Sequence, residues 1–156
     1  YLPADQSSSF SSPLSYIGMP VKSSILFLCT HNSARSQMAE ALMRLHYGNE
    51  FDVYSAGTEA TFVKKPAIAV MEELGVDMSQ HYSKTIEDLG DLKMDYVVTV
   101  CDDAREQCPF HPGKRETIHH SFPDPSGKGE QFEEQVDAFR ITRDQISKWL
   151  NARFGK

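Results

Sequence analysis

A wholly apolar run that ends on a cysteine constrains the fold of this chain more than any other stretch. Residues 25–42 read ILFLCTHNSARSQMAEAL: the apolar run ends at Leu28, Cys29 follows, and a short polar loop leads into a helix-like pattern. A short run without polar residues is typical of a strand covered on both faces. A buried strand followed at once by a helix predicts a parallel sheet built from alternating strands and helices.

The same alternation continues to the end of the chain. FDVYSAG (51–57), DYVVTVC (95–101) and the weaker ETIHHSF (116–122) are the further predicted strands. Helices are predicted after the first loop, from Pro66, and over about 130–154. The predicted fold is therefore α/β: a single domain with a central four-stranded, mostly parallel sheet and helices on both faces.

Each predicted helix carries a stripe of apolar residues that is expected to face the core. The stripes are Met38, Leu42 and Leu45; Ala67, Val70, Met71 and Leu74; and Phe132, Val136, Phe139, Ile146 and Leu150. With 156 residues, of which 40% are apolar, the chain can form one domain with a real core.

Composition limits the cellular setting and the class of partner. Residues 1–23 are rich in Ser and Pro and are predicted to form a disordered arm, either vector-derived or an upstream linker, before a catalytic domain over 24–156. No apolar run approaches the ~20 residues of a membrane span. The net charge of −6 argues against broad nucleic-acid binding. Three cysteines are too few for a disulfide scaffold and favour a reducing, cytoplasmic location.

The loop after the first strand has the features of an oxyanion site. Backbone N–H groups of such a loop and the positive end of the following helix can converge on one anion, and Arg35 adds a planar guanidinium that suits a tetrahedral oxyanion. The same surroundings favour the thiolate of Cys29. Asn32 and Ser36 can hydrogen-bond this sulfur, whereas Thr30, His31, Ser33 and Ala34 are expected to act through their backbone amides. The alternative is a buried structural cysteine followed by an arginine that extends to solvent.

FLCTHNSARSQMAEAL resembles the signature of the low-molecular-weight protein tyrosine phosphatase superfamily, whose members share a Cys-x5-Arg-Ser/Thr loop. The resemblance implies that an Asp-Pro pair after the last strand supplies the catalytic acid. Asp124-Pro125 stands at the matching place, and its carboxyl group would protonate the departing oxygen while Cys29 attacks. An ordinary turn is the alternative for this dipeptide.

The segment VVTVCDDAREQCPF resembles the thioredoxin-coupled arsenate reductase branch of this superfamily. The resemblance implies a thiol relay in which Cys101 attacks the sulfur of Cys29, arsenite leaves, and Cys108 then forms a disulfide with Cys101. No cofactor is expected to be bound. An external thiol donor would reduce the disulfide: thioredoxin is favoured, and glutaredoxin with glutathione or mycothiol are alternatives. Cys29 and Cys101 both end predicted strands, so we expect them to share one rim of the sheet.

Other interpretations stay open on the sequence alone. A phosphotyrosine or phosphoester phosphatase would use the same loop, and an oxyanion- or redox-sensing module would bind without turnover. Cys101 can also be a buried cysteine of a strand, and Cys108 a loop cysteine without a chemical role. A zinc site with His111, His119 and His120 is disfavoured, because six residues separate the two cysteines where about two to four are usual.

Two departures from the family pattern concern the loop and its surroundings. Ala34 stands where several relatives carry another cysteine. Some reductases of the branch hold a potassium ion beside the loop, and Glu40 matches one of its ligands. Tyr82 and Lys84 occupy the places of others, and the Lys84 ammonium can replace the charge of the ion. The sequence therefore predicts no bound metal and no potassium dependence.

Overall fold

The computed structural model of the protein describes residues 21–101 and 111–155. Its four strands are β1 (Ser23–Cys29), β2 (Phe51–Gly57), β3 (Tyr96–Thr99) and β4 (Glu116–His119). They form one sheet in the order β2-β1-β3-β4, and every neighbouring pair is parallel. The predicted α/β class with a four-stranded parallel sheet is confirmed. The predicted arm falls, for its first 20 residues, outside the described residues and stays a prediction.

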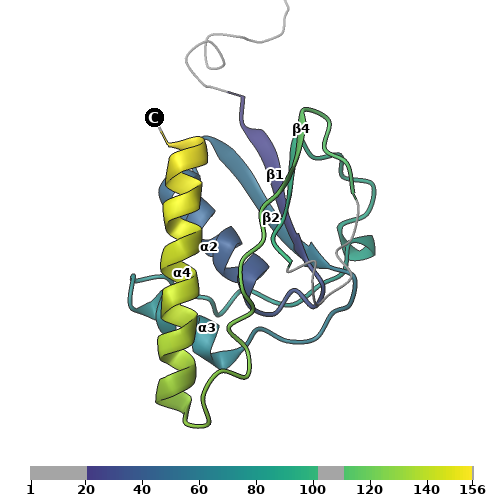
Figure 1. Ribbon diagram of the computed structural model, residues 1–156. Helices are drawn as coiled ribbons and strands as arrows, with labels where there is room; N and C mark the ends of the chain where they lie inside the picture. The colour runs from purple at the N-terminus through teal and green to yellow at the C-terminus, as the bar shows by residue number, and fades with distance from the viewer. Residues whose placement is uncertain (1–20, 102–110, 156) are drawn as a thin grey trace, which may run out of the picture.

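The two faces of the sheet are covered unequally. The α-helices α2 (Arg35–Tyr47), α3 (Lys65–Glu72) and α4 (Phe132–Phe154) all lie on one side, whereas the short 3-10 helix η2 (Glu87–Leu89) contributes to the other side (Figure 1). In β1, Ile25 and Phe27 pack under the α-helices, and Leu26 and Leu28 pack against the opposite face. The uninterrupted apolar run of β1 follows from this double coverage.

The ends of the helical stripes differ from the prediction. Met38 and Leu42 are buried as expected, but Leu45 is 48% exposed because it lies on the last turn of α2. Leu74 is 41% exposed because α3 ends at Glu72 and the chain turns away. Phe132 is 50% exposed at the first turn of α4. The predictions that these three residues belong to the core are wrong.

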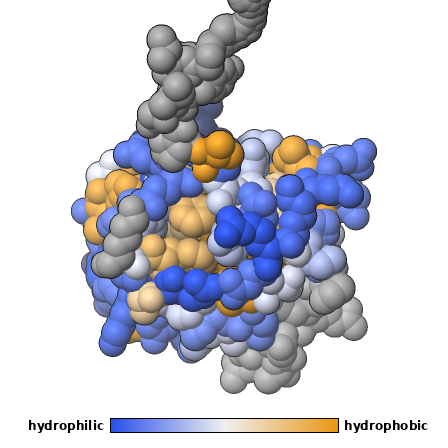
Figure 2. Space-filling model, turned by 90° about the horizontal axis from the view of Figure 1, so that it is seen from above, coloured by the Kyte–Doolittle hydropathy of each residue, from blue (hydrophilic) through white to orange (hydrophobic). Residues whose placement is uncertain are grey.

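A cluster of aromatic rings covers the core at the amino-terminal ends of the strands. Phe51 and Tyr96 begin β2 and β3, and Phe154 ends α4; their ring centroids lie 5.5–6.0 Å apart in edge-on pairs. Figure 2 looks onto this end and shows apolar surface enclosed by polar side chains. The carboxyl ends of the strands, with the loop that follows β1, lie at the opposite end of the molecule.

An ion-pair clamp joins α3 to α4. Glu73 accepts hydrogen bonds from Arg140 Nε (3.0 Å) and Arg143 Nη1 (2.8 Å), and Arg143 Nη1 also donates to the carbonyl of Val70 (2.8 Å). The hydrogen bond from Arg140 is the main cause that lowers the pKa of Glu73 to about 2, and Arg143 adds to it. No helix of the described residues is both long and apolar enough to cross a bilayer.

The lowered pKa of Glu73 predicts a pH-dependent contribution to stability. The ionised carboxylate is favoured in the folded state, so the stabilisation is fully present above the ordinary carboxyl pKa of about 4.5 and is lost as pH falls towards 2. In urea unfolding, Glu73→Gln is expected to be less stable than the wild type near neutrality and to converge with it in acid. The exposed neighbour Glu72 provides the control. Glu72→Gln should have the same stability as the wild type in urea both near neutrality and in acid. A pH-independent difference for Glu73→Gln would contradict the clamp.

Candidate active site

The loop 29–36 begins where β1 ends and is held against the end of β2. Cys29 is the last residue of β1 and pairs with Gly57, the last residue of β2. A Cβ atom at Gly57 would lie 2.7 Å from the carbonyl oxygen of Thr30 and 2.9 Å from the amide nitrogen of Asn32. Only glycine therefore lets the loop pack this closely onto the neighbouring strand.

The carbonyl groups of loop residues 30–33 are all engaged from outside the loop. Because a trans peptide places its C=O and N–H groups on opposite sides, the amides of residues 31–34 are directed towards the interior of the loop. Such a ring of amides is suited to holding an anion, as the sequence analysis expects of this loop. The outer hydrogen bonds are Glu59 N to Thr30 O (3.0 Å), Ser83 Oγ to His31 O (2.9 Å), Gln37 Nε2 to Asn32 O (3.2 Å) and Lys64 N to Ser33 O (2.9 Å).

Asn32 organises the interior of the loop. Its φ of 50° lies in the left-handed region, which asparagine adopts more readily than most residues, and its side chain is fully buried. The amide Nδ2 donates to Ser36 Oγ (2.9 Å) and Ser55 Oγ (3.0 Å). Oδ1 accepts from Lys84 N and Gln37 Nε2, both at 2.9 Å. All hydrogen-bonding groups of this side chain are thus used.

Two groups contact the Cys29 sulfur from within the loop and the start of α2. Ser36 Oγ, which accepts a hydrogen bond from Asn32 Nδ2, lies 2.9 Å from Cys29 Sγ. The backbone N–H of Asn32 donates to the same sulfur at 3.2 Å. The buried sulfur thus has hydrogen-bonding partners on the Ser36 side chain and on the backbone of the loop.

Arg35 and Asp124 complete a cavity over the loop. Arg35 is 5% exposed; its Nη1 donates to the carbonyl of Phe122 (3.0 Å), and its Nη2 lies 3.8 Å from Asp124 Oδ2. Asp124 Oδ1 accepts from the backbone N–H of Ser126 (2.9 Å), which orients the carboxylate. The cavity has a volume of about 200 Å³ and is lined by Cys29, His31, Ser33, Ala34, Arg35, Lys64, Asp124 and Ser126.

Cys101 does not line this cavity but belongs to the same buried cluster as Cys29. It follows β3 by two residues and is fully buried. Its Sγ donates to the carbonyl of Leu28 at 3.9 Å, and Leu28 is the residue before Cys29. Val100 N donates to the same carbonyl at 2.9 Å. The predicted shared rim for the two cysteines thus agrees with the pairing of β1 and β3. Cys108 lies outside the described residues, and its predicted pairing stays a prediction.

The sequence did not indicate several residues that support the loop. Ser55 is fully buried in β2, where its hydroxyl contacts both Asn32 and the carboxylate of Glu40. Gln37 is fully buried as well, and its Oε1 lies 3.0 Å from His81 Nδ1. Burial lowers the pKa of His81, which favours a neutral ring that donates to Gln37. A polar residue inside an apolar strand, as Ser55 is in FDVYSAG, is the one signal that could have pointed to this network.

The surroundings of Glu40 do not fit a potassium ion. Lys84 Nζ donates to the carbonyl of Tyr82 (3.1 Å) and lies 3.8 Å from Glu40 Oε1, so an ammonium group stands between the oxygens that such an ion would need. Arg44 Nη2 contacts Glu40 Oε2 at 2.7 Å. Burial lowers the pKa of Lys84, and the charge of Glu40 opposes that shift. Among the described residues no cluster of three or more His, Cys, Asp or Glu side chains forms a metal site.

Comparison with known proteins identifies the family. The family model for low molecular weight phosphotyrosine protein phosphatases matches residues 24–152. The chain belongs to this family. Curated relatives include arsenate reductases of Halalkalibacterium halodurans, 45% identical over 127 residues, and Bacillus licheniformis, 40% identical over 127 residues. Each of these alignments covers 81% of this chain and 91% of the relative. The resemblance to the arsenate reductase branch is thereby confirmed.

Solved structures of family members share the fold. An arsenate reductase in its phosphate-binding state is 28% identical, with a TM-score of 0.67 over 83% of this chain and 95% of that one. A thioredoxin-dependent arsenate reductase of Corynebacterium glutamicum is 25% identical, with a TM-score of 0.57 over 88% of this chain and 66% of that one.

Replacement of Asn32 tests the organisation of the loop. Asn32→Ala removes the donors to Ser36 and Ser55 and strains the left-handed backbone, whereas Asn32→Gly removes only the side-chain contacts. Both substitutions are expected to lower the free energy of unfolding by roughly 1–3 kcal/mol. The loss should be about 1 kcal/mol larger for Asn32→Ala than for Asn32→Gly, because alanine is strained in the left-handed region. Both should also slow alkylation of Cys29 by iodoacetamide at neutral pH. Unchanged alkylation in two folded variants would show that Asn32 does not direct Ser36 onto the sulfur.

The position of Lys84 predicts that the protein does not respond to potassium. Replacing sodium chloride by potassium chloride at equal ionic strength is expected to change neither the melting temperature nor the rate of turnover, because the ammonium group of Lys84 already stands beside Glu40. A rise of either quantity in potassium chloride would contradict this arrangement.

Proposed function

We propose that this protein reduces arsenate to arsenite and that Cys29 is its nucleophile. The support is the pairing of two features: a loop built for a tetrahedral oxyanion above a doubly hydrogen-bonded sulfur, and relatives at 40–45% identity that are named arsenate reductases. Arsenate would be bound by the inward amides of residues 31–34 and by the guanidinium of Arg35.

The first chemical step is a displacement at arsenic. The Cys29 thiolate attacks arsenic and forms a sulfur–arsenic bond, while one oxygen leaves as water after it accepts a proton from Asp124. Asp124 lines the same cavity as Cys29, and its Oδ2 lies 3.8 Å from Arg35 Nη2. Its protonated carboxyl group would therefore reach an oxygen of the bound anion on the side away from the sulfur.

The second step separates a reductase from a hydrolase. Cys101 attacks the Cys29 sulfur, a disulfide forms, and the electron pair of the sulfur–arsenic bond reduces As(V) to As(III), which leaves as arsenite. Cys108 then attacks Cys101 and releases Cys29, and an external dithiol, for which thioredoxin is the proposed donor, reduces the Cys101–Cys108 disulfide. The single observation that carries this assignment is the fully buried Cys101, whose Sγ reaches the carbonyl of the residue that precedes Cys29.

Cysteine variants test the order of the relay. Cys108→Ser is expected to release about one arsenite per protein and then stop with a Cys29–Cys101 disulfide, because the resolving thiol is missing. Cys101→Ser should release none. Arsenite is measured after mixing the reduced protein with arsenate, and the disulfide is mapped by peptide mass spectrometry. Multiple turnovers by either variant, with thioredoxin and thioredoxin reductase as the donor system, would contradict the relay.

Phosphoester hydrolysis is the second candidate, because Asp124 lines the cavity that holds Cys29, as an acid for a departing alcohol must. This activity needs neither Cys101 nor Cys108. The same two variants therefore distinguish the functions: a phosphatase would keep its rate on an aryl phosphate in both, and its arsenate reduction would be absent even in the wild type.

A further inference from the structure

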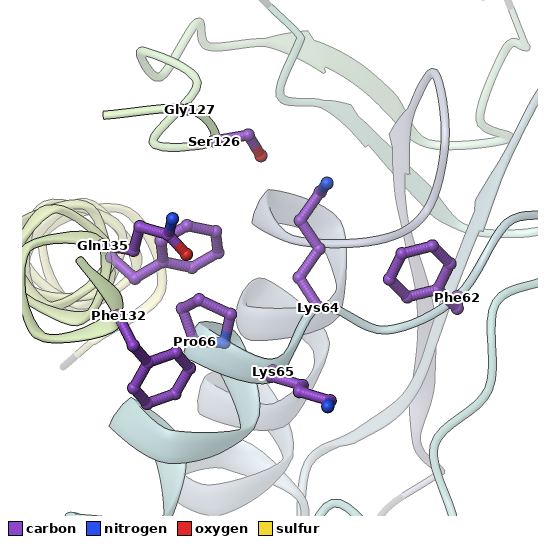
Figure 3. A pocket seen from close by; sticks show the side chains of 9 residues that line it. Phe62, Lys64, Lys65, Pro66, Ser126, Gly127, Phe132 and Gln135 are labelled. Carbon is purple, nitrogen blue, oxygen red and sulfur yellow. The ribbon is translucent and has the colours of Figure 1, made fainter. Parts of the chain in front are cut away.

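Lys64 stands between two adjoining hollows at the end of the sheet. The first is the cavity above Cys29, and the second is a groove of about 350 Å³ lined by Phe62, Lys64, Lys65, Pro66, Ser126, Gly127, Phe132, Gln135 and Phe139. Lys64 and Ser126 line both. Figure 3 shows the Lys64 side chain extending towards Ser126, whereas the side chain of Lys65 points the other way.

The backbone of Lys64 is fixed to the oxyanion loop. Its N–H donates to the carbonyl of Ser33 at 2.9 Å, so the origin of the side chain is set relative to the loop amides. The side chain is half-buried, and its Nζ lies 5.6 Å from the centroid of the Phe62 ring. Lys65, the next residue, is exposed and lines only the groove.

Lys64 has no ion-pair partner among residues 21–101 and 111–155. The carboxylate that shares its cavity, Asp124, is paired with Arg35. Lys64 is also the residue at the N-cap position of α3, where its side chain makes no capping hydrogen bond, and the first turn of α3 holds no acidic residue. The positive end of a helix favours carboxylates and opposes lysines. Lys64 is thus a cation at a position that does not favour it for stability, beside a cavity that contains a buried arginine, and this points to a role in binding an anion.

We propose that Lys64 is a second cationic residue of the oxyanion site and favours the doubly charged form of its ligand. The planar guanidinium of Arg35 would donate two hydrogen bonds to the oxyanion from the buried side. The Lys64 ammonium would attract the anion as a point charge from the solvent side. Phosphate and arsenate exchange between singly and doubly charged forms near neutral pH. Because Lys64 does not touch the sulfur, it is a specificity-determining residue that acts on binding. This inference rests on the proposed oxyanion function of the loop.

Phosphate protection of Cys29 measures this role without turnover. In a Cys101→Ser/Cys108→Ser background, the phosphate concentration that halves the rate of alkylation by iodoacetamide is expected to rise roughly five- to tenfold in Lys64→Gln. Lys64→Arg should keep most of the wild-type affinity, and Lys65→Gln should equal the wild type. The effect of Lys64→Gln should be larger above the second ionisation of phosphate than below it and should shrink in high salt. A merely structural role would produce neither trend.

The steady-state counterpart uses the same substitutions in the protein with all three cysteines. Lys64→Gln should raise KM for arsenate by the same factor with little change in kcat. If phosphate protects Lys64→Gln as well as the wild type, or if Lys65→Gln weakens protection equally, the role of Lys64 is overturned. If no variant turns over arsenate but Lys64→Gln still loses protection, the reductase proposal fails and the role of Lys64 stands. If phosphate does not protect even the wild type, both fail.

Discussion

The hydrogen bonds of the Asn32 carboxamide are the interaction on which the rest of the site depends. From one left-handed residue they reach Ser36 at the start of α2, Ser55 in β2 and the backbone of Lys84. Its Nδ2 donates to the Ser36 hydroxyl, which in turn lies 2.9 Å from Cys29 Sγ. One carboxamide therefore joins the loop, α2 and β2 around this sulfur.

This arrangement requires polar groups to be buried, and the fold compensates each of them. Asn32, Ser36, Gln37 and Ser55 are all fully buried, yet each has a hydrogen-bonding partner. A buried network that is fully satisfied is rigid, whereas a partly satisfied one is costly. Under the proposed function this rigidity would serve the chemistry, since amides that already face the oxyanion need not reorganise when charge develops on it.

The sequence predicted those parts of the molecule that depend on local signals. The apolar run before Cys29 predicted a buried strand, and the spacing to Arg35 predicted the loop and the helix. Ser55 was missed because its position beneath the loop follows from the pairing of β1 with β2, which no local pattern encodes. Lys64 was missed because nothing in the sequence distinguishes it from its neighbour Lys65. Only the hydrogen bond to Ser33 and the two adjoining hollows separate them.

The most direct measurement is the rate at which iodoacetamide alkylates Cys29 at neutral pH. A protein that retains only this cysteine, with the corresponding Cys29→Ser protein as the blank, isolates the reaction of one sulfur. The proposal that Cys29 is the nucleophile, in contact with Ser36 and with the Asn32 backbone, predicts rapid alkylation that slows in Ser36→Ala and that phosphate suppresses. Alkylation no faster than that of an unfolded cysteine peptide, unchanged in Ser36→Ala and insensitive to phosphate, would contradict the proposed role of Cys29.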